Sequence, residues 1–130
     1  MQQQSLTTGQ IEVVKDCAFY RPTGNVTLNE AVDLVDQTVV FARDRRIPKL
    51  FVNASKLTGF PSPSLPERYF LARKWAASSR GKVQLSLVVR AEMIDPEKFG
   101  MIVACNAGMN ADVFSEESEA LAWLLGEAPE

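Results

Sequence analysis

Two capping boxes constrain this chain more than any other feature, because each one fixes where a helix begins. They are Thr27-Leu-Asn-Glu30 and Ser64-Leu-Pro-Glu67. In such a box the N-cap hydroxyl accepts the N–H of the third helical residue, and that residue's carboxylate accepts the N–H of the cap. The apolar residues that follow recur at helical spacing. The sequence therefore predicts helices over about 28–45 and 65–79.

Short apolar runs of β type precede and separate these helices. Segments 11–14 and 17–20 predict a hairpin, 50–52 a buried central strand, 83–89 a second central strand and 112–114 a short edge strand. Two further helices are predicted, one starting at Asp95-Pro-Glu97 and ending near residue 106, the other capped by Ser115-Glu-Glu and ending at Gly126. The order β-β-α-β-α-β-α-β-α predicts an α/β fold. We expect a mixed sheet of four to five strands, with helices packed mainly on one face.

Composition narrows the function classes. The chain has 130 residues, of which 46% are apolar, and a net charge of −2. These values predict one globular domain over residues 1–130, with loose tails at 1–10 and 126–130, and do not favour a nucleic-acid partner. No apolar run reaches the roughly 20 residues of a membrane helix, so no transmembrane segment is expected. The N-terminal residues do not resemble a secretory signal, which predicts a cytoplasmic protein.

Catalytic and metal-binding patterns are missing from the sequence. It contains no histidine, the commonest general base and metal ligand. Its two cysteines, Cys17 and Cys105, stand in apolar surroundings, and we expect both to be buried. No motif pairs two carboxylates or forms a phosphate-binding loop. We therefore expect a protein that is not an enzyme and that holds no metal and no cofactor.

Three stretches of this sequence resemble the SpoIIAA-like, or STAS-like, small α/β domains. They are Gly24-Asn-Val-Thr-Leu-Asn-Glu30 with its helix; Lys49-Leu-Phe-Val-Asn53 with the later Arg68, Phe70 and Ala72; and Asp95-Pro-Glu-Lys-Phe99 with Val113-Phe114 and Glu119-Ala-Leu-Ala-Trp-Leu124. The resemblance covers roughly residues 10–125. It implies a four- or five-stranded sheet flanked by helices, with no conventional active site. Members of this family look like regulatory binding modules or binders of small apolar ligands.

The sequence departs from this family at one point. The anti-sigma-factor antagonists carry a phosphorylatable serine in an Asp-Ser-Ser-Gly-like stretch after the central strand. Here the corresponding stretch reads Asn53-Ala-Ser55 and continues through Thr58-Gly59. A phosphorylation switch would need one of the hydroxyls in this loop: Ser55, Thr58, Ser62 or Ser64.

The segment 53–68 is the best candidate for a binding site. Its loop is long, it follows a central strand, and it ends at a helix start, where backbone N–H groups can hold an anion. The candidate residues for binding a ligand or partner are Lys56, Leu57, Phe60, Ser62, Ser64, Arg68 and Tyr69. In the alternative interpretation, Ser64 and Glu67 only cap the helix and Phe60 covers the core. Six aromatic residues are also candidates for lining a cavity: Phe19, Tyr20, Phe60, Tyr69, Phe70 and Trp75.

Two functions stay open at this point. The first is a non-catalytic regulatory or protein-interaction module that uses segment 53–68. The second is a carrier or sensor of a small hydrophobic, lipid-like ligand held between sheet and helices. A carrier needs a cavity of several hundred cubic ångströms, whereas a protein-interaction module needs a filled core and an exposed apolar patch. An exposed sheet edge would also let two copies pair as a homodimer.

Overall fold

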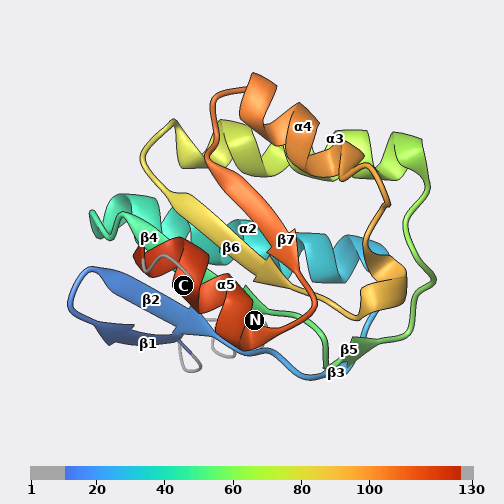
Figure 1. Cartoon of the computed structure of the whole chain (residues 1–130), viewed down its shortest axis with the longest axis horizontal. Helices are drawn as coiled ribbons and strands as arrows, with labels where there is room; N and C mark the ends of the chain where they lie inside the picture. The colour runs from blue at the N-terminus through green and yellow to red at the C-terminus, as the bar shows by residue number, and fades with distance from the viewer. Residues whose placement is uncertain (1–10, 127–130) are drawn as a thin grey trace.

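A five-stranded mixed sheet forms the centre of the computed structural model, which describes residues 11–126 (Figure 1). Its strands are β1 (Ile11–Val14), β2 (Cys17–Tyr20), β4 (Lys49–Asn53), β6 (Gln84–Val88) and β7 (Ala111–Phe114), in the order β1-β2-β4-β6-β7. β1 pairs antiparallel with β2, and the other pairs are parallel. The expected mixed sheet is confirmed. The predicted N-terminal tail, and the C-terminal tail beyond Gly126, lie outside the described residues.

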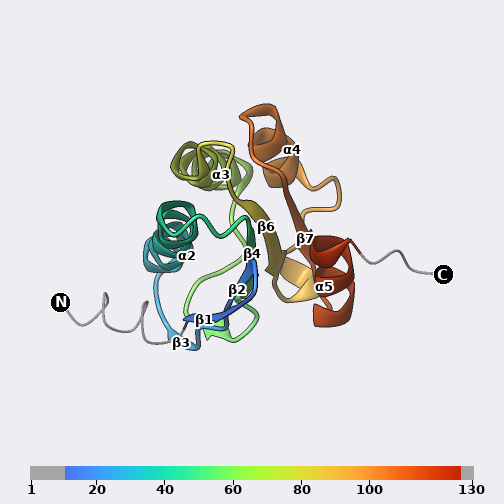
Figure 2. The ribbon, with the colours of Figure 1, turned by 90° about the vertical axis from the view of Figure 1, so that its left-hand side faces the viewer.

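Three helices cover one face of the sheet, and a fourth covers the other face (Figure 2). Helices α2 (Leu28–Asp44), α3 (Leu65–Ser79) and α4 (Phe99–Asn106) share one core cluster with Leu85 and Leu87 of β6. α5 (Glu117–Leu125) packs on the opposite face against Phe51 and Val88. Strand alternation explains this division, since successive side chains point to opposite faces. Within residues 11–126, no helix is long and apolar enough to span a lipid bilayer.

Both capping boxes are formed as predicted. The Glu30 N–H donates to Thr27 Oγ1 over 3.1 Å, and the Thr27 N–H donates to Glu30 Oε1 over 2.9 Å. At the start of α3, the Glu67 N–H donates to Ser64 Oγ over 3.3 Å, and the Ser64 N–H donates to Glu67 Oε1 over 2.8 Å. These local bonds explain why the starts of α2 and α3 could be predicted from the sequence.

Two helix starts and one cysteine differ from expectation. α4 begins at Phe99 because Lys98 adopts a left-handed conformation (φ 53°), while Asp95 Oδ2 accepts the N–H groups of Glu97 (3.1 Å) and Phe99 (3.0 Å) and so forms a turn. α5 has Glu116 at its N-cap with no side-chain capping bond, so Ser115 does not cap it. Cys17 is buried, but Cys105 is exposed on the short helix α4.

A small parallel sheet replaces part of the predicted loop 53–63. It consists of β3 (Gly24–Asn25) and β5 (Leu57–Thr58). The Val26 N–H donates to the Thr58 carbonyl oxygen over 2.7 Å, which continues the ladder beyond β3. The Leu57 side chain on β5 is only 1% exposed. This pairing joins the segment before α2 to the segment before α3.

A substitution at Gly59 tests how much this small sheet contributes to stability. It has a φ of +107°, and an added Cβ would collide with the Val26 carbonyl oxygen and lie 2.9 Å from the Val26 nitrogen. Gly108 also has a positive φ (+99°), but no atom lies within 4 Å of its added Cβ. We therefore expect Gly108→Ala to lower the free energy of unfolding by about 1 kcal/mol and Gly59→Ala by at least about 2 kcal/mol. Urea denaturation of both variants measures the difference, and equal losses would contradict a specific role for the β3–β5 pairing.

Candidate functional site

A cavity of about 100 Å³ lies between the sheet and its three-helix layer, at the carboxyl ends of the parallel strands. We call it the apolar pocket. Helices α2 and α3 contribute Leu28, Ala31, Val32, Val35, Arg68, Leu71 and Trp75; the strand ends, β5 and the connection before α3 contribute Ala54, Leu57, Phe60, Pro63, Leu87, Val89 and Val113; and segment 90–101 contributes Arg90, Met93, Ile94, Asp95, Lys98, Gly100 and Met101. Ligands of α/β proteins commonly bind at this end of a sheet.

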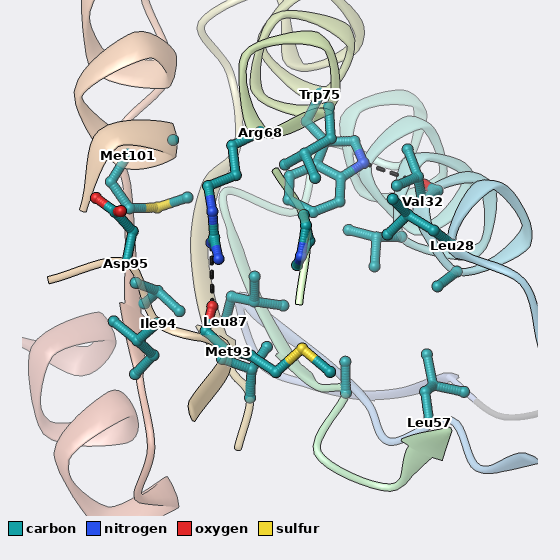
Figure 3. Close-up of a pocket in the computed structure, with 18 of the residues that line it drawn as sticks. Leu28, Val32, Leu57, Arg68, Trp75, Leu87, Met93, Ile94, Asp95 and Met101 are labelled. Carbon is teal, nitrogen blue, oxygen red and sulfur yellow. Dashed lines mark hydrogen bonds between the residues drawn. The ribbon is translucent and has the colours of Figure 1, made fainter. Parts of the chain in front are cut away.

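Trp75 forms one wall of the apolar pocket and ties α3 to α2. Its Nε1–H donates to the Val32 carbonyl oxygen over 3.1 Å, and the side chain is only 4% exposed (Figure 3). A buried indole N–H needs such an acceptor, because an unpaired buried donor costs about 1–3 kcal/mol. The hydrogen bond therefore holds the indole ring in place along the cavity.

Arg68 descends from α3 between Trp75 and Met101 (Figure 3). One terminal nitrogen donates to the Met93 carbonyl oxygen over 3.0 Å, and the other donates to Ser62 Oγ over 2.8 Å. The guanidinium thus links α3 to the 3₁₀ turn η1 (Ala91–Met93) and to the connection before α3. It places a positive charge in a wall that otherwise consists mainly of carbon.

Arg90 fastens the other side of the apolar pocket. It donates to the carbonyl oxygens of Leu57 (3.0 Å) and Ser55 (3.3 Å), and its Nε donates to Glu92 Oε2 over 2.9 Å. These bonds hold β5 beneath the cavity. Sequence reasoning missed segment 90–98 as a pocket wall, because Asp95-Pro-Glu97 was interpreted only as a helix start. Its position directly after a central strand was the signal that could have identified it.

Four of the seven predicted site residues lie at the apolar pocket. Leu57, Phe60 and Arg68 line it, and Ser62 accepts a hydrogen bond from Arg68. The other three lie outside it. Ser64 caps α3, Lys56 is exposed, and the Tyr69 side chain is 43% exposed and packs edge-on against Phe70. A binding role for any of the seven stays a prediction.

The predicted aromatic lining is mostly wrong. Only Phe60 and Trp75 of the six aromatic candidates line the apolar pocket. Phe19 points to the α5 face of the sheet, because it alternates with the core residues Ala18 and Tyr20 along β2. Tyr20 is buried in the main core away from the cavity, and Tyr69 and Phe70 are exposed on α3. Aliphatic side chains and methionines take the places that these rings were expected to fill.

The four loop hydroxyls considered for modification all make hydrogen bonds within the protein. Ser55 Oγ donates to Asn53 Oδ1 over 2.6 Å, and Thr58 Oγ1 donates to the Gly24 carbonyl oxygen over 3.4 Å. The hydroxyls of Ser62 and Ser64 accept from Arg68 and from the Glu67 N–H. These contacts give each hydroxyl a structural role in the loop.

A second hollow, of about 410 Å³, lies on the surface between α2 and α3. We call it the α2–α3 groove, and it is lined by Leu28, Asn29, Val32, Asp33, Glu67, Phe70, Leu71 and Lys74. Lys74 and Asp33 form an ion pair of 3.5 Å across it. Leu28, Val32 and Leu71 line both this groove and the apolar pocket. The two hollows therefore share side chains.

A charged network anchors the start of segment 53–68 to α5. Arg21 donates to both carboxylate oxygens of Glu117, over 2.8 and 3.2 Å, and Asn53 Nδ2 donates to Glu117 Oε2 over 2.6 Å. Asn53 Oδ1 in turn accepts the Ser55 N–H over 2.9 Å. The hydrogen bond from Arg21, followed by that from Asn53, lowers the pKa of Glu117 below its ordinary value.

Comparisons with known proteins assign neither a family nor a function to this chain. No family model matches the sequence, and no curated protein matches it. Among solved structures, the chain is similar to the anti-sigma factor antagonist SpoIIAA in its unphosphorylated form. The sequence identity is 15%, the match covers 92% of this chain and 98% of that chain, and the TM-score is 0.49. This similarity concerns the arrangement of helices and strands alone.

Variants of Ser64 test whether its hydroxyl caps helix α3. Ser64→Ala removes the acceptor for the Glu67 N–H, so we expect it to lower the free energy of unfolding by about 1 kcal/mol. Ser64→Asp keeps an acceptor at the N-cap and should retain most of the stability. Thermal denaturation of both variants checks this expectation. If Ser64→Ala is as stable as the parent, the hydroxyl is not the cap that the geometry indicates.

Glu117 provides a test by pH. Because its pKa is lowered in the folded protein, its stabilising contribution is present above the ordinary glutamate pKa of about 4.3 and is lost as pH falls through the folded value. We expect Glu117→Gln to cost up to about 1 kcal/mol at pH 7, given the partial exposure of the pair. The difference from the parent should shrink below about pH 4. Urea denaturation across pH 3–7 measures it, with the exposed Glu119→Gln as a matched control; a constant difference would contradict the assignment.

Proposed function

We propose that this protein is a non-catalytic regulatory module that binds another protein through the α2–α3 groove. The observation that carries the proposal is Phe70, whose side chain is 71% exposed beside that groove. Burial of a phenylalanine side chain contributes about 1.5–3 kcal/mol. Exposed aromatic residues beside a hollow are typical of sites where a partner's side chains dock.

Neighbouring side chains extend this apolar surface over the first turns of α3. Leu65 is 53% exposed and Tyr69 is 43% exposed, and the rings of Tyr69 and Phe70 meet at 78°. The aliphatic floor of the groove is bordered by Glu67, Asp33 and Lys74. Apolar centres with charged borders are the usual composition of protein–protein interfaces. The partner that fits is a protein segment that presents apolar side chains flanked by polar ones.

The size of the interior cavity favours protein binding over lipid transport. Pockets for drug-sized or lipid-like ligands measure about 300–1,000 Å³. The apolar pocket measures about 100 Å³, and well-packed side chains fill the rest of the core. A long acyl chain would require the helices to move apart.

The charged groups of the apolar pocket support a non-catalytic role. Asp95 accepts two backbone N–H groups, and Lys98 donates to Asp112 over 2.9 Å. General acid–base catalysis needs a side chain within hydrogen-bond reach of the reacting group, and these groups make structural hydrogen bonds instead. A cytoplasmic location belongs to the same proposal and is supported by the free thiols of Cys17 and Cys105.

A second candidate function is the sensing of a small apolar molecule. The observation that favours it is the apolar pocket itself, which side chains leave unfilled. An apolar cavity of about 150 Å³ can bind benzene, so a cavity of about 100 Å³ suits a somewhat smaller compact group. The side chains shared with the α2–α3 groove offer a physical link between such a ligand and a docked protein.

Phe70 tests protein binding directly. A photo-crosslinking amino acid placed at position 71 or 74 in the groove, in the cells that make the protein, identifies the partner. The purified partner should then bind Phe70→Ser about 10- to 100-fold more weakly than the parent protein, since the loss of one buried aromatic ring is worth that factor. Calorimetry measures the affinities. The stability of the variant should stay within about 0.5 kcal/mol, because the ring is exposed.

Ile102→Ser is the matched control, since Ile102 is a large apolar residue on α4 with 52% exposure that does not line the groove. It should leave the affinity within about twofold. Equal losses for both variants would contradict docking at the α2–α3 groove. A crosslink only to a second copy of the chain would show that the groove is a homodimer interface, which also contradicts the proposal.

A further inference from the structure

The positive charge of Arg68 is not paired with a carboxylate in the part of the chain that the structure describes. Its two hydrogen-bond partners, the Met93 carbonyl oxygen and Ser62 Oγ, are neutral. The other two cations of the apolar pocket are paired, Arg90 with Glu92 and Lys98 with Asp112, each over 2.9 Å. Arg68 is therefore the cation of this pocket that can accept an anionic ligand without breaking an ion pair.

Asp95 is the carboxylate that lines the same pocket, and it forms no ion pair with Arg68 in the part of the chain that the structure describes. Within residues 11–126, the ion pairs with a nitrogen–oxygen distance of 4.0 Å or less do not include one between Arg68 and Asp95. Asp95 Oδ2 instead accepts the N–H groups of Glu97 and Phe99. Figure 3 shows its carboxylate beside Met101, on the far side of the Arg68 stem from Trp75.

The chemistry of the guanidinium indicates which anion fits. Arginine carries five N–H donors in a planar fork that matches a carboxylate. The hydrogen bonds to Met93 and Ser62 use one donor on each terminal nitrogen. Half-burial beside aliphatic side chains lowers the local dielectric, so an ion pair there is stronger than one at the open surface.

The volume of the apolar pocket limits the rest of the ligand. About 100 Å³ admits a compact branched apolar group that is smaller than a benzene ring, by comparison with the benzene-sized cavity noted above. A long acyl chain is too large. The walls supply Leu87, Met93 and Trp75 for apolar contact beside the guanidinium (Figure 3).

We propose that the apolar pocket binds a free, small monocarboxylic acid, whose apolar body fills the cavity and whose carboxylate pairs with Arg68. This proposal rests on the second candidate function, the sensing of a small apolar molecule, and adds the chemical class of that molecule. Arg68 favours a ligand with a negative charge, and the cavity volume limits the size of the ligand's apolar body.

The test is a titration of the ¹⁵N-labelled full chain, followed by NMR through its two tryptophan indole signals. Trp75 lines the apolar pocket, while Trp123 packs against Phe114 on the α5 side and serves as an internal control. The probes are 3-methylbutanoate and 2-methylpropanoate, each compared at neutral pH with its uncharged amide. We expect the acids to shift the Trp75 signal saturably with a Kd of about 1 mM, at least about tenfold below that of the amides, and to leave Trp123 unmoved.

Two arginine variants test whether Arg68 causes the preference for acid over amide. Arg68→Gln should reduce the preference for acid over amide to less than about twofold. Arg73→Gln is the matched control on the same helix, where the Arg73 guanidinium lies over the Tyr69 ring, and it should keep the full preference. If Arg68→Gln fails to fold, Arg68→Lys keeps the charge and should retain a preference, weakened by the loss of the planar fork.

The contradicting outcomes are distinct. Equal binding of acid and amide would overturn the role of Arg68 while leaving the pocket as a site for small apolar ligands. No shift of Trp75 by any probe up to about 50 mM would overturn both this proposal and the second candidate function. A peptide ending in leucine that binds more than about tenfold tighter than the free acids would reassign the pocket to a protein terminus and overturn the assignment to a free acid.

Discussion

The parallel pairing of β4 with β6 positions the apolar pocket and the segments that surround it. Leu50 lies beside Leu85 and Val52 beside Leu87, and both strands are buried on both faces. Because the two strands run in the same direction, the segments that follow them leave at the same edge of the sheet. Segment 54–63 and segment 89–98 meet there, and the apolar pocket lies between them and the helices above.

Polar side chains hold these two connecting segments together, because little regular secondary structure is available there to pair their backbone groups. Arg90 donates to two carbonyl oxygens next to or within β5, and Arg68 donates to one carbonyl oxygen in η1. Each bond satisfies an acceptor that would otherwise be costly to bury. The same bonds fix the distance between the walls, so the cavity is set by the polar connections as well as by core packing.

The agreement between sequence and structure is best where the determinants are local. The two capping boxes placed the starts of α2 and α3, since a cap is made by residues three positions apart. The helix α4 and its end near residue 106 were predicted correctly, but its start was not. Asp95 has the right chemistry for an N-cap, but it also accepts backbone N–H groups in a turn, and the left-handed Lys98 delays the helix to Phe99. The β3–β5 pairing joins residues more than thirty positions apart, and no local sequence pattern predicted it.

For the candidate site, local sequence patterns were enough to predict the region and part of its chemistry. A long loop after a central strand pointed to Leu57, Phe60 and Arg68, because strand ends and helix starts follow from local patterns. Tertiary structure decided the rest. Only the packing of α3 against α2 and against segment 90–98 set the cavity volume, left the Arg68 guanidinium on neutral partners, and turned Phe70 outward. These properties depend on distances between residues far apart in the chain, which apolar periodicity and capping do not encode.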